Sequence, residues 1–132
     1  MNSLEENIIE CIKRCQSNIQ FNCLILYSES VNGSYKFNII QKILDDLIIL
    51  NIVHNDRNKD NLTLVFDNGS ELTVMIPWSW RSGQYNYILV DEDLSKHEKE
   101  YGEVRYFIYN DENNNKYYNW RNDFKTIKIL EV

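Results

Sequence analysis

An acidic pair directly follows one of the most apolar stretches of the sequence. Tyr87–Val90 (YILV) has the length and composition of a buried strand, and Asp91 and Glu92 come immediately after it. A carboxylate at such a strand end can hold Mg²⁺ through water, and a second carboxylate can orient a hydrolytic water. Asp91 is therefore a candidate metal ligand, and Asp91 with Glu92 is the candidate catalytic pair if the protein is an enzyme. Asp93 follows them, and the three acidic residues together could bind a divalent cation; the alternative, and the commoner meaning of such a group, is a solvated acidic cluster at the end of a strand.

A second segment that could carry chemistry begins near residue 24. LILY is a strand-like run, and the SESVNGS that follows it supplies turn residues before a helical pattern. With Ser28 at the first glycine position of the phosphate-loop spacing G-x-x-x-x-G-K-S/T, Gly33 falls on the second glycine. Ser28, Gly33 and Ser34 are therefore the candidate nucleotide-binding residues.

Taken in order, these segments resemble the N-terminal ATPase core of phage large terminases and related P-loop helicase-like proteins. Residues 65–72 (VFDNGSEL) are similar to a strand pair that reads F-x-NGS-x-I in that family, and residues 81–92 (RSGQYNYILVDE) are similar to its RG..YDYIIVDE segment. The resemblance covers roughly residues 21–110. It implies that the strand at 22–27 lies parallel to the strand at 86–90, with the Asn-Gly hairpin beyond them.

The chain departs from this family at the residues that handle phosphate. Ser34 stands at the phosphate-loop lysine, which neutralises the β- and γ-phosphates, and Tyr35 stands at the magnesium-binding hydroxyl. Lys36 comes two positions late, and two residues rotate a side chain by about 200° on a helix, so we expect that Lys36 cannot replace the missing lysine. If the chain descends from this family, we expect that it has lost ATP hydrolysis and needs no cofactor. Only the alternative, an active enzyme, would need Mg²⁺ and ATP.

Two tryptophans form a candidate protein-binding loop. Trp78 and Trp80 flank a single serine, so both indoles face the same side of an extended segment, next to Arg81. Exposed aromatic and arginine side chains are common interface anchors, which makes these three residues candidates for contact with a partner. The alternative is that the two indoles cover one end of the core.

All three cysteines lie in the first 23 residues. Cys11 and Cys15 are spaced i,i+4 on a predicted helix, where two thiolates could share a soft metal ion, and only Cys23 is near them in sequence. We expect reduced, partly buried thiols, with a zinc site or a disulfide as the alternatives.

Two amphipathic helices and several short strands must position these groups. Apolar side chains recur at helical spacing over residues 3–19 and about 36–50, and the polar stretch at 54–61 predicts a loop. Asn68-Gly69 between two strand-like runs predicts a type I′ turn, because both central residues of that turn need a positive φ. Strands are predicted at residues 21–27, 62–66, 72–76, 87–90, 104–109 and 126–130.

The predicted fold is one compact domain over residues 1–132, of the α/β or α+β class, with a central mixed sheet flanked by the two helices. The net charge of −6 disfavours a broad face for duplex nucleic acid. No apolar run approaches the roughly 18–20 residues of a membrane span. Acidic Glu5 and Glu6 stand where a signal peptide is basic, so we expect a cytoplasmic protein without a membrane partner, in the host cytoplasm if it is phage-encoded.

Two functions of different classes fit these observations. The leading hypothesis is a small phage or mobile-element protein with a degenerate P-loop-like core, which binds a host or viral protein and inhibits or regulates a nucleic-acid-handling machine. An acidic surface can occupy a basic groove that is meant for nucleic acid. The alternative is a divergent Mg²⁺-dependent nucleotide-binding or ATPase subunit that uses Asp91 and Glu92. A homodimer is compatible with either function.

Overall fold

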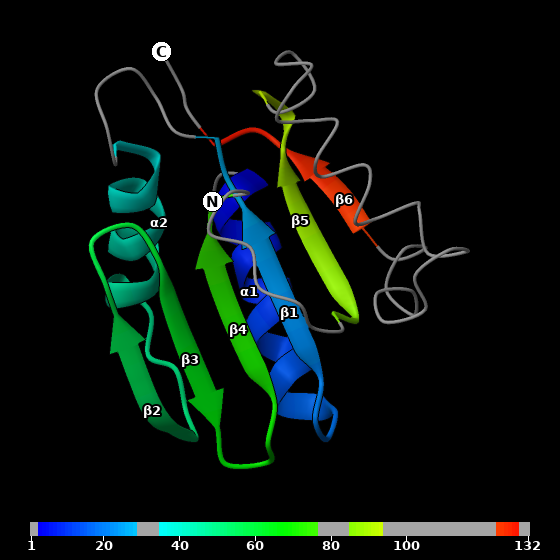
Figure 1. The fold of residues 1–132 in the computed structure, drawn as a ribbon. Helices are drawn as coiled ribbons and strands as arrows, with labels where there is room; N and C mark the ends of the chain where they lie inside the picture. Colours follow the sequence, from blue (N-terminus) through cyan, green and yellow to red (C-terminus); the bar gives the residue numbers. More distant parts are fainter. Residues whose placement is uncertain (1–2, 29–34, 77–84, 94–123, 130–132) are drawn as a thin grey trace, which may run out of the picture.

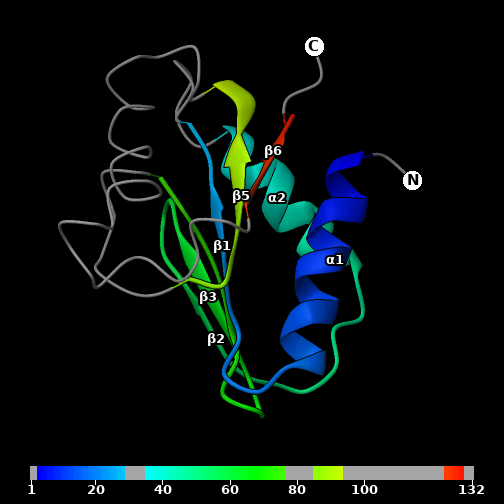
Figure 2. The same cartoon turned by 90° about the vertical axis from the view of Figure 1, so that its right-hand side faces the viewer.

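A computed structural model describes residues 3–28, 35–76, 85–93 and 124–129 of the protein. In these residues the chain forms a mixed six-stranded sheet and two helices, which lie on the same face of the sheet (Figures 1 and 2). The fold is thus a single α/β domain, as the sequence predicted. The elements are α1 (Ser3–Ser17), β1 (Asn22–Leu26), α2 (Tyr35–Asp46), β2 (Ile52–Arg57), β3 (Leu62–Phe66), β4 (Glu71–Met75), β5 (Tyr87–Asp91) and β6 (Phe124–Ile127).

The strand order β2-β3-β4-β1-β5-β6 places β1 near the centre of the sheet. β1 pairs in parallel with β4 on one side and with β5 on the other, and β5 pairs in parallel with β6. The predicted parallel pairing of the strands at 22–27 and 86–90 is therefore present. β2, β3 and β4 pair antiparallel, beyond β1 on the side away from β5.

The turn between β3 and β4 differs from the predicted type I′ geometry. Gly69 has a φ of 84°, but Asn68 is not among the described non-glycine residues with positive φ. The Asn68 side chain is used elsewhere, since its Nδ2 donates to the carbonyl oxygens of Cys15 (2.8 Å) and Asn18 (3.1 Å) at the end of α1. The type I′ turn is not confirmed, and the asparagine ties this turn to the last turn of α1.

The prediction of a loop at 54–61 is wrong for its first half, which belongs to strand β2. β2 is an edge strand that pairs only with β3 among the described strands. The side chains from Val53 to Arg57 are exposed, so this strand has no apolar alternation from which it could be recognised. Charged residues such as Asp56 and Arg57, with the register shift after Ile52, are common features of sheet edges that avoid further pairing.

The two faces of the sheet differ in what they bury. The face toward the helices carries the main core, in which Cys23, Ile25 and Tyr27 meet Ile8, Phe37 and other buried side chains of the helices. On the opposite face β1 and β5 also present buried apolar side chains, namely Leu24, Leu26, Ile88 and Val90. Over β3 and β4 the same face carries threonines, so it changes from apolar to polar across the sheet.

Several sequence predictions fall outside the described residues, including the strand at 104–109 and the aromatic loop with Trp78, Trp80 and Arg81. The helix predicted at 36–50 ends earlier, at Asp46, and the predicted C-terminal strand begins earlier, at Phe124. Neither of the two described helices is long and apolar enough to span a bilayer.

Candidate functional site

The carboxyl ends of β1 and β5 lie side by side at one edge of the sheet, because the two strands are adjacent and parallel. Ser28 follows β1 by two residues, and Asp91 is the last residue of β5. The first turn of α2 lies at the same edge (Figure 1). Ligands of open α/β sheets bind outside the carboxyl ends of strands, so this is the place to look for a site.

Lys36, in the first turn of α2, brings these strand ends together. Its Nζ donates three hydrogen bonds, each of 2.7 Å, to Ser28 Oγ, Asp91 Oδ2 and Asp93 Oδ2. The Lys36 side chain is 3% exposed and that of Asp91 is 1% exposed, whereas Asp93 reaches the surface at 31%. The cluster is therefore a buried ion pair with a second carboxylate at its rim.

Both oxygens of the Asp91 carboxylate are also occupied. Besides the ammonium, Oδ2 accepts hydrogen bonds from the backbone N–H and the hydroxyl of Ser28, both at 2.8 Å. Oδ1 accepts the backbone N–H of Asp93 at 3.0 Å. A buried charge is stable only when its hydrogen-bonding groups are satisfied, and here three donors of the lysine and both oxygens of the aspartate have partners.

The sequence prediction about Lys36 missed this cluster. We expected the two-residue offset to turn the side chain away from a bound phosphate, and that comparison did not consider the strand-end residues that Lys36 contacts in the fold. One signal in the sequence could have indicated the contact. A lysine in the first turn is unfavourable for the helix dipole, and α2 has no acidic residue there to offset it, so a carboxylate from another segment would stabilise it.

The structure places the other predicted site residues as follows. Ser28 and Asp91, one from each of two separate predicted motifs, are brought into direct contact. Glu92 follows Asp91 and is half-buried. Gly33 and Ser34 of the predicted phosphate loop lie outside the described residues, as do Trp78, Trp80 and Arg81.

The arrangement limits the chemistry available at this edge. A triphosphate that needed the Lys36 ammonium would compete with two carboxylates that already hold it at 2.7 Å. A Mg²⁺ ion at Asp91 would compete with that same ammonium and with two donors from Ser28. Within the described ranges, no group of three or more His, Cys, Asp or Glu side chains could hold a metal ion.

The three cysteines form a second buried cluster, between α1 and β1. Cys11, Cys15 and Cys23 are all buried free thiols, as predicted for reduced cysteines, and no disulfide joins them. The Cys23 thiol donates to the Cys11 carbonyl oxygen (3.6 Å), and the Cys15 thiol donates to that of Glu71 (3.6 Å). The Cys15 and Cys23 thiols thus connect α1 to the sheet through hydrogen bonds in which each thiol is the donor.

Hydrogen bonds and burial hold two of these thiols in the neutral form. The hydrogen bond with Cys23 and then desolvation raise the pKa of Cys15 far above the ordinary 9.0. The hydrogen bond with Cys11 raises the pKa of Cys23 most; Cys15 opposes it, burial adds to the rise, and Arg14 has a smaller lowering effect. Between pH 9 and the raised values, the folded state keeps protons that the unfolded state releases.

We therefore expect the free energy of unfolding to fall as the pH rises past about 9, by at most about 1.4 kcal/mol per pH unit for each thiol. Urea unfolding at about pH 8 and about pH 10, with reductant present, measures this loss. The control is Cys15→Ala with Cys23→Ala, which keeps every tyrosine and lysine and should lose less stability over the same interval. Equal alkaline losses in the two proteins would contradict the assignment to the thiols.

No protein-family model matches this chain, and neither does any curated protein or any solved structure. The resemblance to the ATPase core of phage large terminases therefore depends on the short motifs of the sequence alone. The contacts among Ser28, Lys36, Asp91 and Asp93 are independent of that resemblance.

Proposed function

We propose that this chain is a small phage or mobile-element protein with a degenerate P-loop-like core, which regulates a nucleic-acid-handling machine by binding a host or viral protein. It acts by binding and not by turnover of a nucleotide. The observation that supports this proposal best is the state of Lys36, a strand-end cation that is neutralised by Asp91 and Asp93 within the protein.

The electrostatics of the cluster agree with a site that is closed to phosphate. One ammonium and two carboxylates sum to a charge of −1, so the group presents no net positive charge to an anion. The Lys36 side chain is only 3% exposed, so a phosphate could contact the ammonium only after this side chain had moved. The net charge of the whole chain, which includes this cluster, is −6 and favours partners with basic surfaces.

One observation favours the second candidate function, a divergent Mg²⁺-dependent nucleotide-binding subunit. Ser28, Lys36 and Asp91 meet at the carboxyl ends of two parallel strands, where α/β proteins commonly bind ligands. In that case nucleotide would draw Lys36 away from the carboxylates, and Mg²⁺ would take its place at Asp91. The two candidates differ in a measurable way, because only the second predicts that Mg·ATP stabilises the folded state.

We expect millimolar Mg·ATP to leave the thermal unfolding transition of the protein unchanged, compared with Mg²⁺ alone. A ligand at 100 times its dissociation constant would add about 2.7 kcal/mol, which such a measurement detects readily. The control is the Asp91→Asn, Glu92→Gln double variant, whose response to nucleotide is compared with its own transition without nucleotide. Stabilisation of the natural protein that disappears in this variant would reject the proposed function and support the second candidate.

A further inference from the structure

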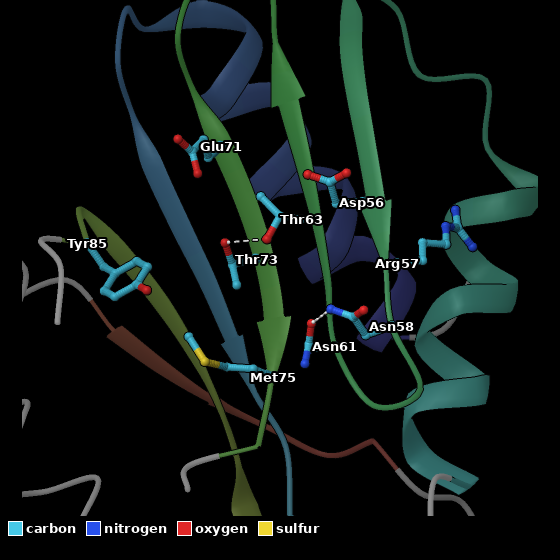
Figure 3. A pocket seen from close by; sticks show the side chains of 9 residues that line it. All are labelled: Asp56, Arg57, Asn58, Asn61, Thr63, Glu71, Thr73, Met75 and Tyr85. Atoms are coloured by element: carbon cyan, nitrogen blue, oxygen red, sulfur yellow. Dashed lines mark hydrogen bonds between the residues drawn. The ribbon is translucent and has the colours of Figure 1, made fainter. Parts of the chain in front are cut away.

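The sheet face opposite the helices is hollowed over β2, β3 and β4 (Figure 3). The hollow has a volume of about 620 Å³ and is lined mainly by polar side chains, among them Asp56, Asn61, Thr63, Glu71 and Thr73. We call it the β2–β4 groove. It lies on the other side of the sheet from the main core and shares no lining residue with the Lys36 cluster.

Strand register sets the polar row across the floor of this groove. Asp56 pairs with Thr63, and Thr63 pairs with Thr73, so the three side chains follow one another across β2, β3 and β4. The two threonine hydroxyl oxygens lie 3.4 Å apart. Glu71 is two residues before Thr73 on the same strand and therefore faces the same way, as Figure 3 shows.

The groove carries negative charge that the described residues do not neutralise. Asp56 and Glu71 are exposed, and neither forms an ion pair within the part of the chain that the structure describes. Arg57 also lines the groove, but its guanidinium points toward α2 and is engaged there (Figure 3). Its Nη2 contacts Asp45 Oδ1 at 2.7 Å, and its Nη1 donates to Gln41 Oε1 at 3.2 Å.

We propose that the β2–β4 groove binds an arginine-bearing segment of a protein partner. A guanidinium presents five donors in a planar fork, and this groove offers two carboxylates together with hydroxyl and amide oxygens as acceptors. Nucleic acid is excluded as the ligand of this groove, because its phosphates would be repelled by the carboxylates of Asp56 and Glu71. This inference rests on the proposed function, in that it names the surface and the partner chemistry of a protein that acts by binding.

The test uses a hexa-arginine peptide as the probe, at low ionic strength. Titration into the ¹⁵N-labelled protein should shift backbone amides of β2, β3 and β4 before those of α1. The Asp56→Asn, Glu71→Gln double variant should bind the peptide about 10-fold more weakly, which corresponds to about 1.4 kcal/mol. Hexa-lysine should bind the natural protein more weakly than hexa-arginine, because a lysine ammonium cannot form the two parallel bonds of a guanidinium.

The matched control is Glu6→Gln with Asp46→Asn, which removes the same two charges from exposed positions on the helices. We expect its affinity for hexa-arginine to change less than about 2-fold, since charges at such positions act only through the screened field of the whole protein. Equal weakening in the two double variants, or shifts spread evenly over the protein, would overturn the proposal. A response to Mg·ATP would instead overturn the proposed function and leave this result standing.

Discussion

Replacing Lys36 with methionine should lower the free energy of unfolding by about 3–5 kcal/mol, the range found when one partner of a buried ion pair is removed. Methionine has nearly the length of lysine without its charge, so the change leaves little extra space. It leaves Asp91, which is 1% exposed, without its opposite charge and with only the hydrogen bonds of Ser28 and Asp93. Chemical denaturation followed by circular dichroism measures the loss.

The control for this change lies on the same helix. Lys42 is 78% exposed and contacts Asp46 at 3.5 Å, so Lys42→Met should change stability by no more than about 0.5 kcal/mol. Adding Asp91→Asn to Lys36→Met should recover part of the loss, because the uncompensated charge is then absent. If Lys36→Met costs no more than Lys42→Met, the buried ion pair is not a stabilising element of this fold.

Lys36 also shows where prediction from the sequence stops. Buried strands could be predicted, because Leu62–Phe66 and Tyr87–Val90 have the apolar patterns that burial requires, and the parallel pairing of β1 with β5 followed from the resemblance. The sequence predicts both Ser28 and Asp91 as site residues, each from a separate motif. The contact of Lys36 with both could not be predicted from spacing, since it joins α2 to the ends of two strands whose residues lie 8 and 55 positions away in the sequence.

The edge strand β2 and the turn at Asn68-Gly69 were also difficult to predict from the sequence, because both depend on contacts with other segments. In β2 the side chains from Val53 to Arg57 are exposed, so the sequence shows no alternation of apolar and polar residues. The strand is defined by its backbone pairing with β3. Asn68 favoured a type I′ turn by local propensity alone. In the structure its side chain donates to the end of α1 and accepts the backbone N–H of Ser70, and the contacts with the distant segment are not encoded in a short motif.

An apolar contact beside the ion pair explains how so tight a polar cluster is positioned. The rings of Tyr27 and Phe37 stack with centroids 5.8 Å apart and an interplanar angle of 20°. Each ring belongs to the direct sequence neighbour of a cluster residue, since Ser28 follows Tyr27 and Lys36 precedes Phe37. The stacked rings therefore pack the end of β1 against the first turn of α2, directly beside the contact between Lys36 and Ser28.

Phe37→Ala should consequently lower the free energy of unfolding by about 3–5 kcal/mol, the usual cost of truncating a buried phenylalanine. Phe37 is fully buried, and its loss removes both the packing in the core and the stacking on Tyr27. Phe37→Leu keeps most of the apolar volume, so it should cost less and serves as the control. Denaturant titrations of both variants measure the difference.

The same variant tests whether the rings and the ion pair act as one unit. If stacking positions Lys36, then Phe37→Ala already weakens the contact with Asp91, and adding Lys36→Met should cost less than it does in the natural protein. Neighbouring residues that share a network show coupling energies of about 0.5–3 kcal/mol in such a cycle. Strict additivity of the two changes would mean that the ion pair keeps its geometry without the stacked rings, and that the backbone of α2 and β1 alone positions it.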